Sequence, residues 1–530
     1  MTEIPTAQST HALHIIPRPL RVTVTGRYYA LAPTDTITFT GPGSEDLALL
    51  LAEYLRPATG YAFPLVSSET PAASGIHVVT RGNPLPDDAG FQEEDYTCRV
   101  SETGIILDAK TPAGLARAIQ TFRQLLPERI FSQSVEPGAW PVPCLSIEDK
   151  PGFRWRGMHL DVARHFFSVE AVCRFIDLIA LHRFNICHLH LTDDQGWRLE
   201  IKKYPKLTEV GAWRKETLVG HELDRPRRYD GQPYGGFFSQ EEMKTIIAFA
   251  ARRQVTVVPE IEMPGHAQEV IAAYPELGYK PSGVEVRCHW GISQHVLNVD
   301  DSTLAFFKDV LDEVIALFPS KFIHVGGDEA PKFEWSESPS VQARMAELGI
   351  SDENGLQSWF IRQMLDHLTA HGRRLIGWDE ILEGGLPDGA SVMSWQGEEG
   401  GVKAAEAGHD VVMAPCQWVY FDHHQAEPVR EEPLGFFGTI TTEHVYAYEP
   451  VPPSVPAECV PHILGAQGQL WSEYIPSAEH LDYMAFPRAC ALAEVLWLPK
   501  EELKYSRFLA DLPHHRRRLA GLGVRAHPRP

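Results

Sequence analysis

Two adjacent acids, Asp328 and Glu329, are the residues of this chain whose types and setting point most clearly to chemistry. They follow a short apolar run, 322–325, and the pair Gly326 and Gly327. Successive residues of a strand point to opposite faces, and glycine frees the backbone, so both carboxyl groups can be aimed at one point. Two close carboxyl groups do not ionise equally easily, which suits a proton donor beside a charge-stabilising partner. An isolated Asp-Glu pair would indicate an acidic surface turn, but the apolar run before it favours a catalytic role.

Other polar and aromatic side chains follow similar apolar runs. They are Arg164 and His165, Asp193 to Trp197, His266, Trp378 to Glu380, Trp395, Trp418, Tyr420 and Asp422, and Trp471 with Glu473. Sugar rings have apolar C–H faces that stack on aromatic rings, and their hydroxyl groups bind carboxylates and guanidinium groups. One tryptophan alone is more often a core residue, but four after consecutive runs reverse that expectation. The mixture predicts a carbohydrate site.

A pair of histidines, His188 and His190, opens an alternative. Two residues apart on one strand, they share a face as in metal-dependent amidohydrolases, and Asp193 or His266 would complete a metal site. The pair lies in the middle of the second run, however, and histidines there can pack inside a barrel. We expect no metal and no other cofactor, and no GxSxG motif indicates a serine nucleophile.

Eight apolar runs, alternating with helical patterns, are available to position these side chains. The expected strands are 155–161, 185–191, 255–261, 322–325, 374–376, 391–395, 410–414 and 463–469. Ser168 can cap one intervening helix, and Ser239 with Glu242 forms a capping box for another. Further helices are expected at 303–318, 352–370 and 480–497. Eight such units predict a (β/α)8 TIM barrel, whose sites lie at the carboxyl ends of its strands. A doubly wound sheet is disfavoured because neither a GxGxxG nor a Walker motif is present.

A smaller α+β domain without a reactive cluster is expected before the barrel. Its pattern comprises β-branched runs at 21–24, 36–39 and 76–79, a hairpin at 96–108, helices at 44–55 and 112–126, and a connector at 127–143. The predicted organisation is therefore a non-catalytic domain over 1–147, a catalytic barrel over 148–505 and a C-terminal helical tail over 506–530.

The composition of the chain limits the classes of partner that it is expected to bind. A chain of 530 residues favours more than one domain, and its net charge of −22 argues against binding nucleic acid through phosphates. We find no apolar stretch long enough to span a bilayer and no secretory pattern over residues 1–19. The eight cysteines are scattered singly. We expect a cytoplasmic protein with no nucleic-acid or membrane partner, and the oligomeric state stays open.

Six ordered motifs give the chain a specific resemblance. They are 156–165, 188–197, 260–266, 324–329, 377–380 and 469–473. Over residues 155–500 the chain resembles a family 20 glycoside hydrolase, a β-N-acetylhexosaminidase. Its front part is similar to the small domain that precedes such barrels. The resemblance implies an exo-acting hydrolase that removes terminal β-linked GlcNAc, with GalNAc as a further candidate, from oligosaccharides or glycoconjugates.

The resemblance also implies a retaining, substrate-assisted mechanism through an oxazolinium intermediate, in which the substrate's 2-acetamido oxygen is the nucleophile. Glu329 would be the general acid and base, Asp328 would stabilise the acetamido nitrogen, and Tyr420 would hold its carbonyl. The implied binding residues are Arg164, Glu473 and Asp422 for hydroxyl groups, Asp193 and His266 as supports, and Trp359, Trp378, Trp395 and Trp471 as walls.

Two segments and two rival functions stay open at this point. The resemblance is weakest over 421–460, and the stretch 221–238 is likewise unassigned. Both are expected to border the site and to set what sits beyond the cleaved bond, with an ordinary solvated loop as an equal alternative for 221–238. The first rival is a metal-dependent amidohydrolase or deacetylase acting on amino sugars. The second is a non-catalytic sugar-binding barrel, against which the intact Asp328–Glu329 pair argues.

Overall fold

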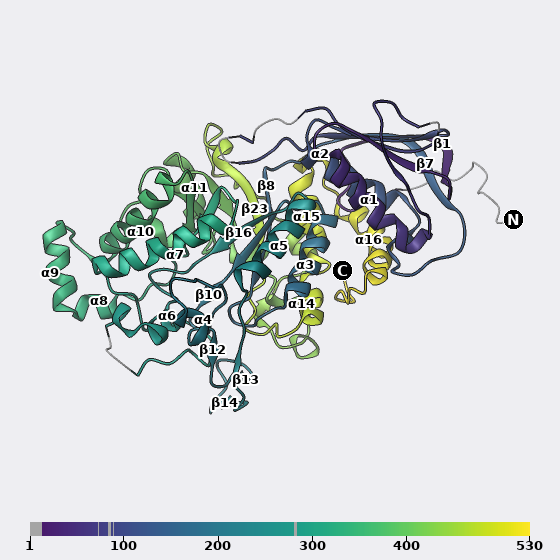
Figure 1. Cartoon of the computed structure of the whole chain (residues 1–530). Helices are drawn as coiled ribbons and strands as arrows, with labels where there is room; N and C mark the ends of the chain where they lie inside the picture. Colours follow the sequence, from purple (N-terminus) through teal and green to yellow (C-terminus); the bar gives the residue numbers. More distant parts are fainter. Residues whose placement is uncertain (1–12, 73, 83–85, 88–89, 280–282) are drawn as a thin grey trace.

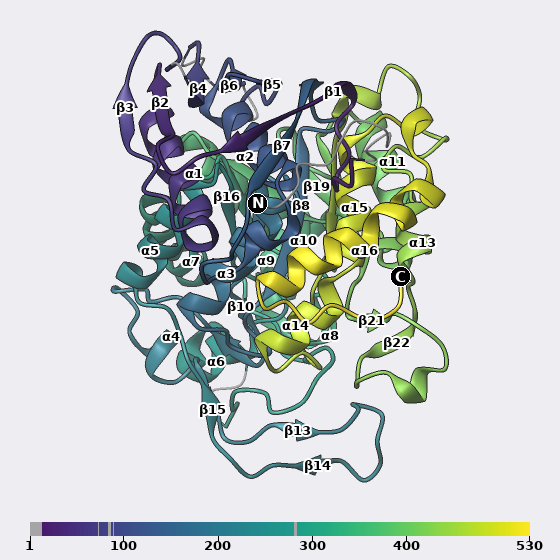
Figure 2. The same cartoon turned by 90° about the vertical axis from the view of Figure 1, so that its right-hand side faces the viewer.

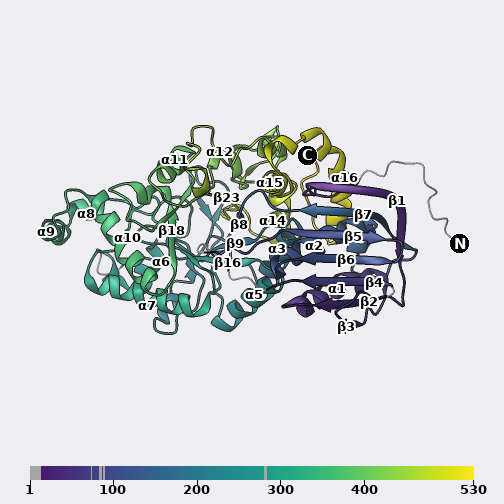
Figure 3. The ribbon, with the colours of Figure 1, turned by 90° about the horizontal axis from the view of Figure 1, so that it is seen from above.

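The computed structural model describes residues 13–72, 74–82, 86–87, 90–279 and 283–530. The first twelve residues, on which part of the prediction of no secretory pattern rests, lie outside these ranges. A seven-stranded sheet forms the N-terminal part, in the order β1-β7-β5-β6-β4-β2-β3, which can be followed across Figure 3. Its strands are β1 (Arg21–Leu31), β2 (Thr36–Thr40), β3 (Leu65–Ser67), β4 (Gly75–Thr80), β5 (Tyr96–Ser101), β6 (Gly104–Ala109) and β7 (Trp140–Asp149). Helices α1 (Ser44–Thr59) and α2 (Pro112–Leu125) complete an α+β domain.

The expected hairpin is present, since β5 and β6 pair antiparallel with Ser101 opposite Gly104. The expected connector 127–143 needs correction at both ends. A short 3-10 helix, Glu128–Phe131, begins it, and β7 already starts at Trp140. The Trp140 ring is buried under the Arg129 guanidinium, 4.3 Å from the ring centre, which favours an ordered strand start over a loop.

A closed barrel of eight parallel strands follows and confirms the predicted fold class (Figure 1). Its strands are β8 (Trp155–Asp161), β9 (Ile186–His190), β16 (Thr256–Glu260), β17 (Phe322–His324), β18 (Arg374–Trp378), β19 (Ser391–Ser394), β20 (Val411–Met413) and β23 (Ile463–Gly468). Its longer helices are α3 (Val169–Leu181), α5 (Gln240–Arg252), α7 (Asp301–Leu317), α9 (Pro339–Leu348), α10 (Glu353–Ala370), α14 (Ala478–Ala485) and α15 (Arg488–Trp497).

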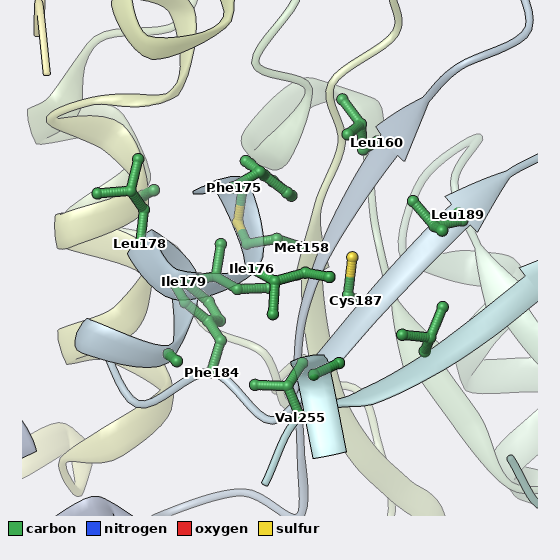
Figure 4. Packing of buried hydrophobic residues seen from close by; sticks show 14 of the residues in the cluster. Met158, Leu160, Phe175, Ile176, Leu178, Ile179, Phe184, Cys187, Leu189 and Val255 are labelled. Carbon is green, nitrogen blue, oxygen red and sulfur yellow. The ribbon is translucent and has the colours of Figure 1, made fainter. Parts of the chain in front are cut away.

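Side-chain alternation along the barrel strands separates an outer core from the interior. Met158 of β8 and Cys187 of β9 point outward and pack against Ile176 and Ile179 of α3 (Figure 4). The intervening histidines, such as His188, point inward, as a period of two requires. The Ser168 hydroxyl accepts a hydrogen bond from the Ala171 amide at the start of α3, as its sequence predicts.

The helix expected over 480–497 is in fact two helices. α14 ends at Ala485 and α15 begins at Arg488, with Phe486 and Pro487 between them. Proline has no amide proton to donate and its ring clashes with the preceding turn, so the apolar pattern continues across a break. The capping box at the start of α5 is present as predicted, with Ser239 and Glu242 in reciprocal hydrogen bonds.

Buried ion pairs join the N-terminal domain to the barrel. Asp149, at the end of β7, lies 2.6 Å from Arg183 and accepts hydrogen bonds from the Trp497 indole at 3.0 Å. Glu94 contacts Arg156 near the start of β8 at 2.5 Å. The C-terminal helix α16 (Tyr505–Gly521) lies to one side of the N-terminal domain in Figure 2 and contacts both parts: Arg518 donates a hydrogen bond to the Gln124 carbonyl oxygen at 2.9 Å, and the His515 ring lies 2.8 Å from that of His182. These contacts lie at the amino ends of the strands, so the carboxyl ends stay open.

Short elements occupy the loops at those carboxyl ends. They include the pairs β10 (Thr192–Asp193) with β11 (Gly196–Trp197), β12 (Trp213–Arg214) with β15 (Tyr234–Gly235), β13 (Leu218–Val219) with β14 (Arg228–Tyr229), and β21 (His423–His424) with β22 (Phe436–Thr439). Among the described residues, no helix combines the length and apolar character needed to cross a bilayer.

Candidate active site

The acid pair is held by an unusual backbone just beyond β17. Gly326 and Gly327 have φ values of 65° and 90°, and Glu329 itself has a φ of 44°. A Cβ on Gly326 would lie 1.7 Å from Oε2 of Glu262, so no larger residue fits there. A non-glycine residue in this region carries strain of about 1–3 kcal/mol. This strained backbone conformation directs the side chains of Asp328 and Glu329 into the same space.

His266 links the two acids. Its Nε2 lies 3.5 Å from Oδ2 of Asp328 and 3.3 Å from Oε2 of Glu329, while its Nδ1 lies 3.2 Å from Oδ1 of Asp193. Burial alone would lower the pKa of His266, but the charges of Asp193 and Asp328 outweigh it and raise the pKa well above the ordinary value. His266 is therefore a buried cation that faces both acids.

A second cation, Arg164, is held in place by several carboxyl groups. Its guanidinium lies 2.8 Å from Asp193 and 3.1 Å from Asp161, and it donates a hydrogen bond to Gln195 at 3.1 Å. Glu473 faces the same guanidinium at 3.9 Å. These contacts fix the orientation of the Arg164 guanidinium, and its Nη1 is turned towards Glu473.

The carboxyl ends of the strands enclose a cavity of about 390 Å³. Of the residues predicted from the sequence, those that line it are Arg164, His266, Asp328, Glu329, Trp378, Trp395, Tyr420, Asp422, Trp471 and Glu473. This volume is in the range of small-molecule sites. A cavity of about 780 Å³ at the amino ends of the strands contains none of these residues. The predicted residues therefore converge, although they are spread over more than 300 positions.

Hydrogen bonds orient the aromatic wall. The Trp378 indole donates to Glu260 at 2.7 Å, and the Trp395 indole donates to Glu380 at 2.8 Å. The Trp378 ring centre lies 5.8 Å from that of Trp471. The indoles of Trp378 and Trp395 are thus each fixed at one edge by a carboxyl group, and both residues line the cavity.

The tyrosine Tyr420 completes this wall. Its ring is stacked with that of Trp395 at 6.2 Å and lies at the same distance from Trp471. Burial raises its pKa well above 10, so the hydroxyl group keeps its proton and can donate a hydrogen bond.

The two halves of the barrel contribute different chemistry. Segments that follow β8, β9, β16 and β17 carry Arg164, Asp193, His266 and the acid pair, whereas β18 to β23 and their loops carry Trp378, Trp395, Tyr420 and Trp471. Asp422 and Glu473 are the acids of the second half that reach the cavity. The cavity therefore has an ionic side and an aromatic side.

Burial alters the ionisation of several acids in the cavity. It raises the pKa of Asp328 to about 6, against the opposing attraction of His266, and the charge of Glu329 adds to the rise. Burial and the charges of Asp328 and Asp379 raise the pKa of Glu380 to about 9. Burial also raises the pKa of Asp422, with the charge of Glu473 adding to the effect. The acids thus differ widely in proton affinity, as acid–base chemistry requires.

The histidines that suggested a metal site have other partners. His190 Nδ1 lies 2.7 Å from Glu260 and its Nε2 lies 2.9 Å from Asp193. Burial would lower its pKa, but Glu260 and Asp193 raise it to about 10, so both nitrogens carry protons. Both nitrogens of His190 are thus engaged by carboxyl groups. His188 lies between Gln467 and Glu260, at 2.9 and 3.1 Å. The pair therefore fits a structural role better than a metal centre.

Two aromatic predictions need correction. Trp359 is not among the residues that line the cavity; it lies on α10, with the Arg344 guanidinium 5.4 Å from its ring centre. Trp418 stacks on His444 at 4.2 Å and is also absent from the lining. Asp193 does not reach the cavity either and supports Arg164, His190 and His266 from behind, which agrees with its expected supporting role.

Loop residues that were not predicted form the outer part of the lining. They are His221, Glu222, Leu223, Trp290, Gly291, Ile292, Cys416, His423, Phe436, Phe437 and Tyr474. Most come from the stretches 221–238 and 421–460, which were expected to border the site. Their only sequence signal is aromatic and aliphatic side chains within Gly- and Pro-rich segments.

Comparisons with known proteins agree with this site. Residues 153–500 match the model of the glycosyl hydrolase family 20 catalytic domain, and residues 12–150 match that of domain 2 of the same family. A β-hexosaminidase of Porphyromonas gingivalis is 41% identical over 518 residues, which are 97% of this chain and 64% of that protein. A β-N-acetylhexosaminidase of Cellulomonas fimi is 31% identical, with 97% of this chain and 96% of that protein covered.

Solved structures are similar over nearly the whole chain. The family 20 β-N-acetylhexosaminidase of Streptomyces coelicolor matches with a TM-score of 0.84, 30% identity and 99% of both chains covered. The exo-β-N-acetylglucosaminidase of Vibrio harveyi, solved in complex with N-acetylglucosamine, matches with a TM-score of 0.84 and 34% identity over 99% of this chain and 80% of that one.

Proposed function

The chain belongs to glycosyl hydrolase family 20, and from this premise we propose that it is an exo-β-N-acetylhexosaminidase. It would remove terminal β-linked GlcNAc from the non-reducing ends of oligosaccharides or glycoconjugates and retain the anomeric configuration. The observation that carries this proposal is the convergence of Asp328 and Glu329, with His266 between them, in one cavity walled by tryptophans.

The first chemical step cleaves the glycosidic bond. Glu329, part-exposed within the cavity, donates a proton to the leaving oxygen as the bond from that oxygen to C1 breaks. The oxygen of the substrate's own 2-acetamido group bonds to C1 and forms an oxazolinium ion. Asp328, in its ionised form, accepts a hydrogen bond from the acetamido N–H and stabilises its positive charge.

The second step restores the acid. A water molecule gives a proton to Glu329, and the oxygen of this water bonds to C1 while the bond between C1 and the acetamido oxygen breaks. Two successive attacks on opposite faces of C1 retain its configuration. Tyr420, which keeps its proton, donates a hydrogen bond to the acetamido carbonyl oxygen and holds it in attack geometry.

Recognition of the sugar divides between the two sides of the cavity. Arg164, Glu473 and Asp422 are positioned to bind ring hydroxyl groups, and Asp422 has a buried carboxyl oxygen without a protein partner. Trp378 and Trp471 form the wall against the sugar and the acetamido methyl group. GalNAc differs from GlcNAc only at the 4-hydroxyl group, so it is a further candidate substrate.

The decisive experiment compares two glycosides, and the unaltered protein with one variant. Nitrophenyl β-GlcNAc should be hydrolysed, while the β-glucoside, which lacks the acetamido group, should be almost inert. Glu329→Gln should lower kcat about 10²–10⁴-fold on substrates with poor leaving groups, because it removes the proton donor. Rapid cleavage of the glucoside, or full activity of Glu329→Gln, would refute the mechanism.

The same assay separates the rival functions. A deacetylase would release acetate and not the aglycone, and a metal-dependent one would lose activity with a chelator. A sugar-binding barrel would bind GlcNAc without releasing anything. We expect aglycone release that a chelator does not affect.

A further inference from the structure

The cavity changes character from its base to its mouth. At the base, Trp378 and Asp328 are almost fully buried. At the mouth, Leu223, Ile292 and Phe437 are 61%, 43% and 50% exposed, and Phe436 is 41% exposed. All four line the same cavity. Exposed apolar side chains that gather beside a binding site mark a surface that another group covers.

Three separate segments build this outer wall and fix one another. The rings of Phe437 and His221 lie 4.5 Å apart, and His221 in turn stacks on Tyr474 at 5.1 Å. The Phe436 amide donates a hydrogen bond to the carbonyl oxygen of Asp422 at 2.9 Å, which ties β22 to an acid of the cavity. The wall is therefore pre-formed, and a ligand need not order it.

Two polar groups of the outer wall, those of Glu222 and Tyr474, have partners within the protein. Glu222 accepts a hydrogen bond from the Trp290 amide at 3.2 Å and pairs with Arg227. The Tyr474 hydroxyl accepts a hydrogen bond from the Glu222 amide at 3.1 Å. These two groups are thus engaged internally, whereas, among the described residues, His221 Nε2 and His423 Nδ1 have no hydrogen-bond partner. The exposed side chains of the wall offer a ligand mainly apolar contact.

The position of Glu329 decides which part of a substrate meets this wall. Its side chain is 31% exposed, against 11% for Asp328, so it lies on the mouth side of the pair. On the proposed function, the terminal sugar fills the base and Glu329 faces the glycosidic oxygen. Whatever lies beyond that oxygen towards the mouth belongs to the leaving group.

We propose that Leu223, Ile292, Phe436 and Phe437 form a leaving-group site that selects alkyl or aryl aglycones over leaving groups rich in hydroxyl groups. This inference rests on the proposed function and adds the chemical class of the preferred substrate. No loop closure is involved, because the four side chains already face one cavity.

An alkyl series tests the site. We would measure kcat/KM for methyl, butyl and octyl β-GlcNAc glycosides, whose leaving alcohols differ little in acidity, and for chitobiose. Each methylene placed against the wall should raise kcat/KM about two- to fourfold, so butyl should exceed methyl by about tenfold or more. Leu223→Ser and Phe437→Ser should flatten this dependence while the inhibition constant of free GlcNAc stays unchanged.

Val135→Ser supplies the matched control, since Val135 is 67% exposed in the N-terminal domain and should leave the alkyl dependence intact. A flat alkyl series in the unaltered protein would overturn the inference, as would a higher kcat/KM for chitobiose than for the butyl glycoside. Failure of the proposed function would look different, because the methyl glycoside would then not be hydrolysed and GlcNAc would not inhibit.

Discussion

Replacing His266 by Gln should move the acidic limb of the pH–rate profile to higher pH. In the proposed mechanism Asp328 works in its ionised form, and its pKa is about 6. Activity should therefore be present above pH 6 and fall about tenfold per pH unit below it. His266, whose Nε2 lies 3.5 Å from Asp328, is the cation that keeps this pKa from rising further.

The expected size of the shift follows from that distance. A unit charge at 3.5 Å is worth about 1 kcal/mol in water and about 5 kcal/mol at an effective dielectric constant of 20, or roughly one to three pKa units. If the pKa of Asp328 rises from about 6 to between about 7 and 9, its ionised fraction at pH 7 falls from about 90% to between about 50% and 1%.

The assay is kcat/KM for nitrophenyl β-GlcNAc between pH 4 and 9. His423→Gln is the control, because it removes an imidazole of the same cavity whose pKa burial lowers to about 4, so no charge is lost at neutral pH. Its acidic limb should stay near that of the unaltered protein. An acidic limb of His266→Gln that stays near pH 6, or moves lower, would refute the assignment of this limb to Asp328.

Three further predictions concern the backbone, the domain interface and a buried acid. Gly326→Ala should abolish most activity and lower Tm, because the new methyl group would meet Glu262 at 1.7 Å; normal kcat would show that the turn relaxes freely. Arg183→Met should lower the stability by about 3–5 kcal/mol by leaving Asp149 buried without its cation, with GlcNAc inhibition unchanged; an unaltered urea midpoint would contradict this. Glu380 has its pKa raised by burial to about 9, so the folded state keeps a proton that the unfolded state loses at lower pH, and stability should fall as the pH rises towards 9. Tm of Glu380→Gln should therefore decline less between pH 5 and 9 than that of the unaltered protein, and equal declines would count against it.

The barrel was predictable from the sequence because its strands are short apolar runs, buried along their whole length, and each run is followed by polar residues. The acid pair, His266 and Trp378 were predictable for the same reason, since each lies at the carboxyl end of a strand or within a few residues of it, and the fold brings the strand ends together. Trp359 has no such anchor. It lies inside a helix, where a residue's direction depends on packing that its neighbours in sequence do not specify.

The outer wall could not be predicted in detail. Leu223 lies in a loop and Phe437 in the short strand β22, more than 200 residues apart, and only tertiary contacts bring them to one cavity. The broken helix at Pro487 and the early start of β7 at Trp140 show the same limit on a smaller scale. The apolar pattern of a sequence locates its helices and strands, whereas the residues at which they begin and end depend on local features of the backbone, such as a proline.

The division of the cavity into an ionic and an aromatic side has a consequence for how related enzymes diverge. Proton handling depends on residues up to Glu329, whereas the tryptophan wall comes from residue 378 onwards. Substitutions of these tryptophans can therefore reshape which ring substituents are accepted while Asp193, His266 and Glu329 stay in place. Variation in substrate preference should accumulate there first, and a chimera that exchanges only the second half should inherit its donor's preference together with its recipient's pH profile.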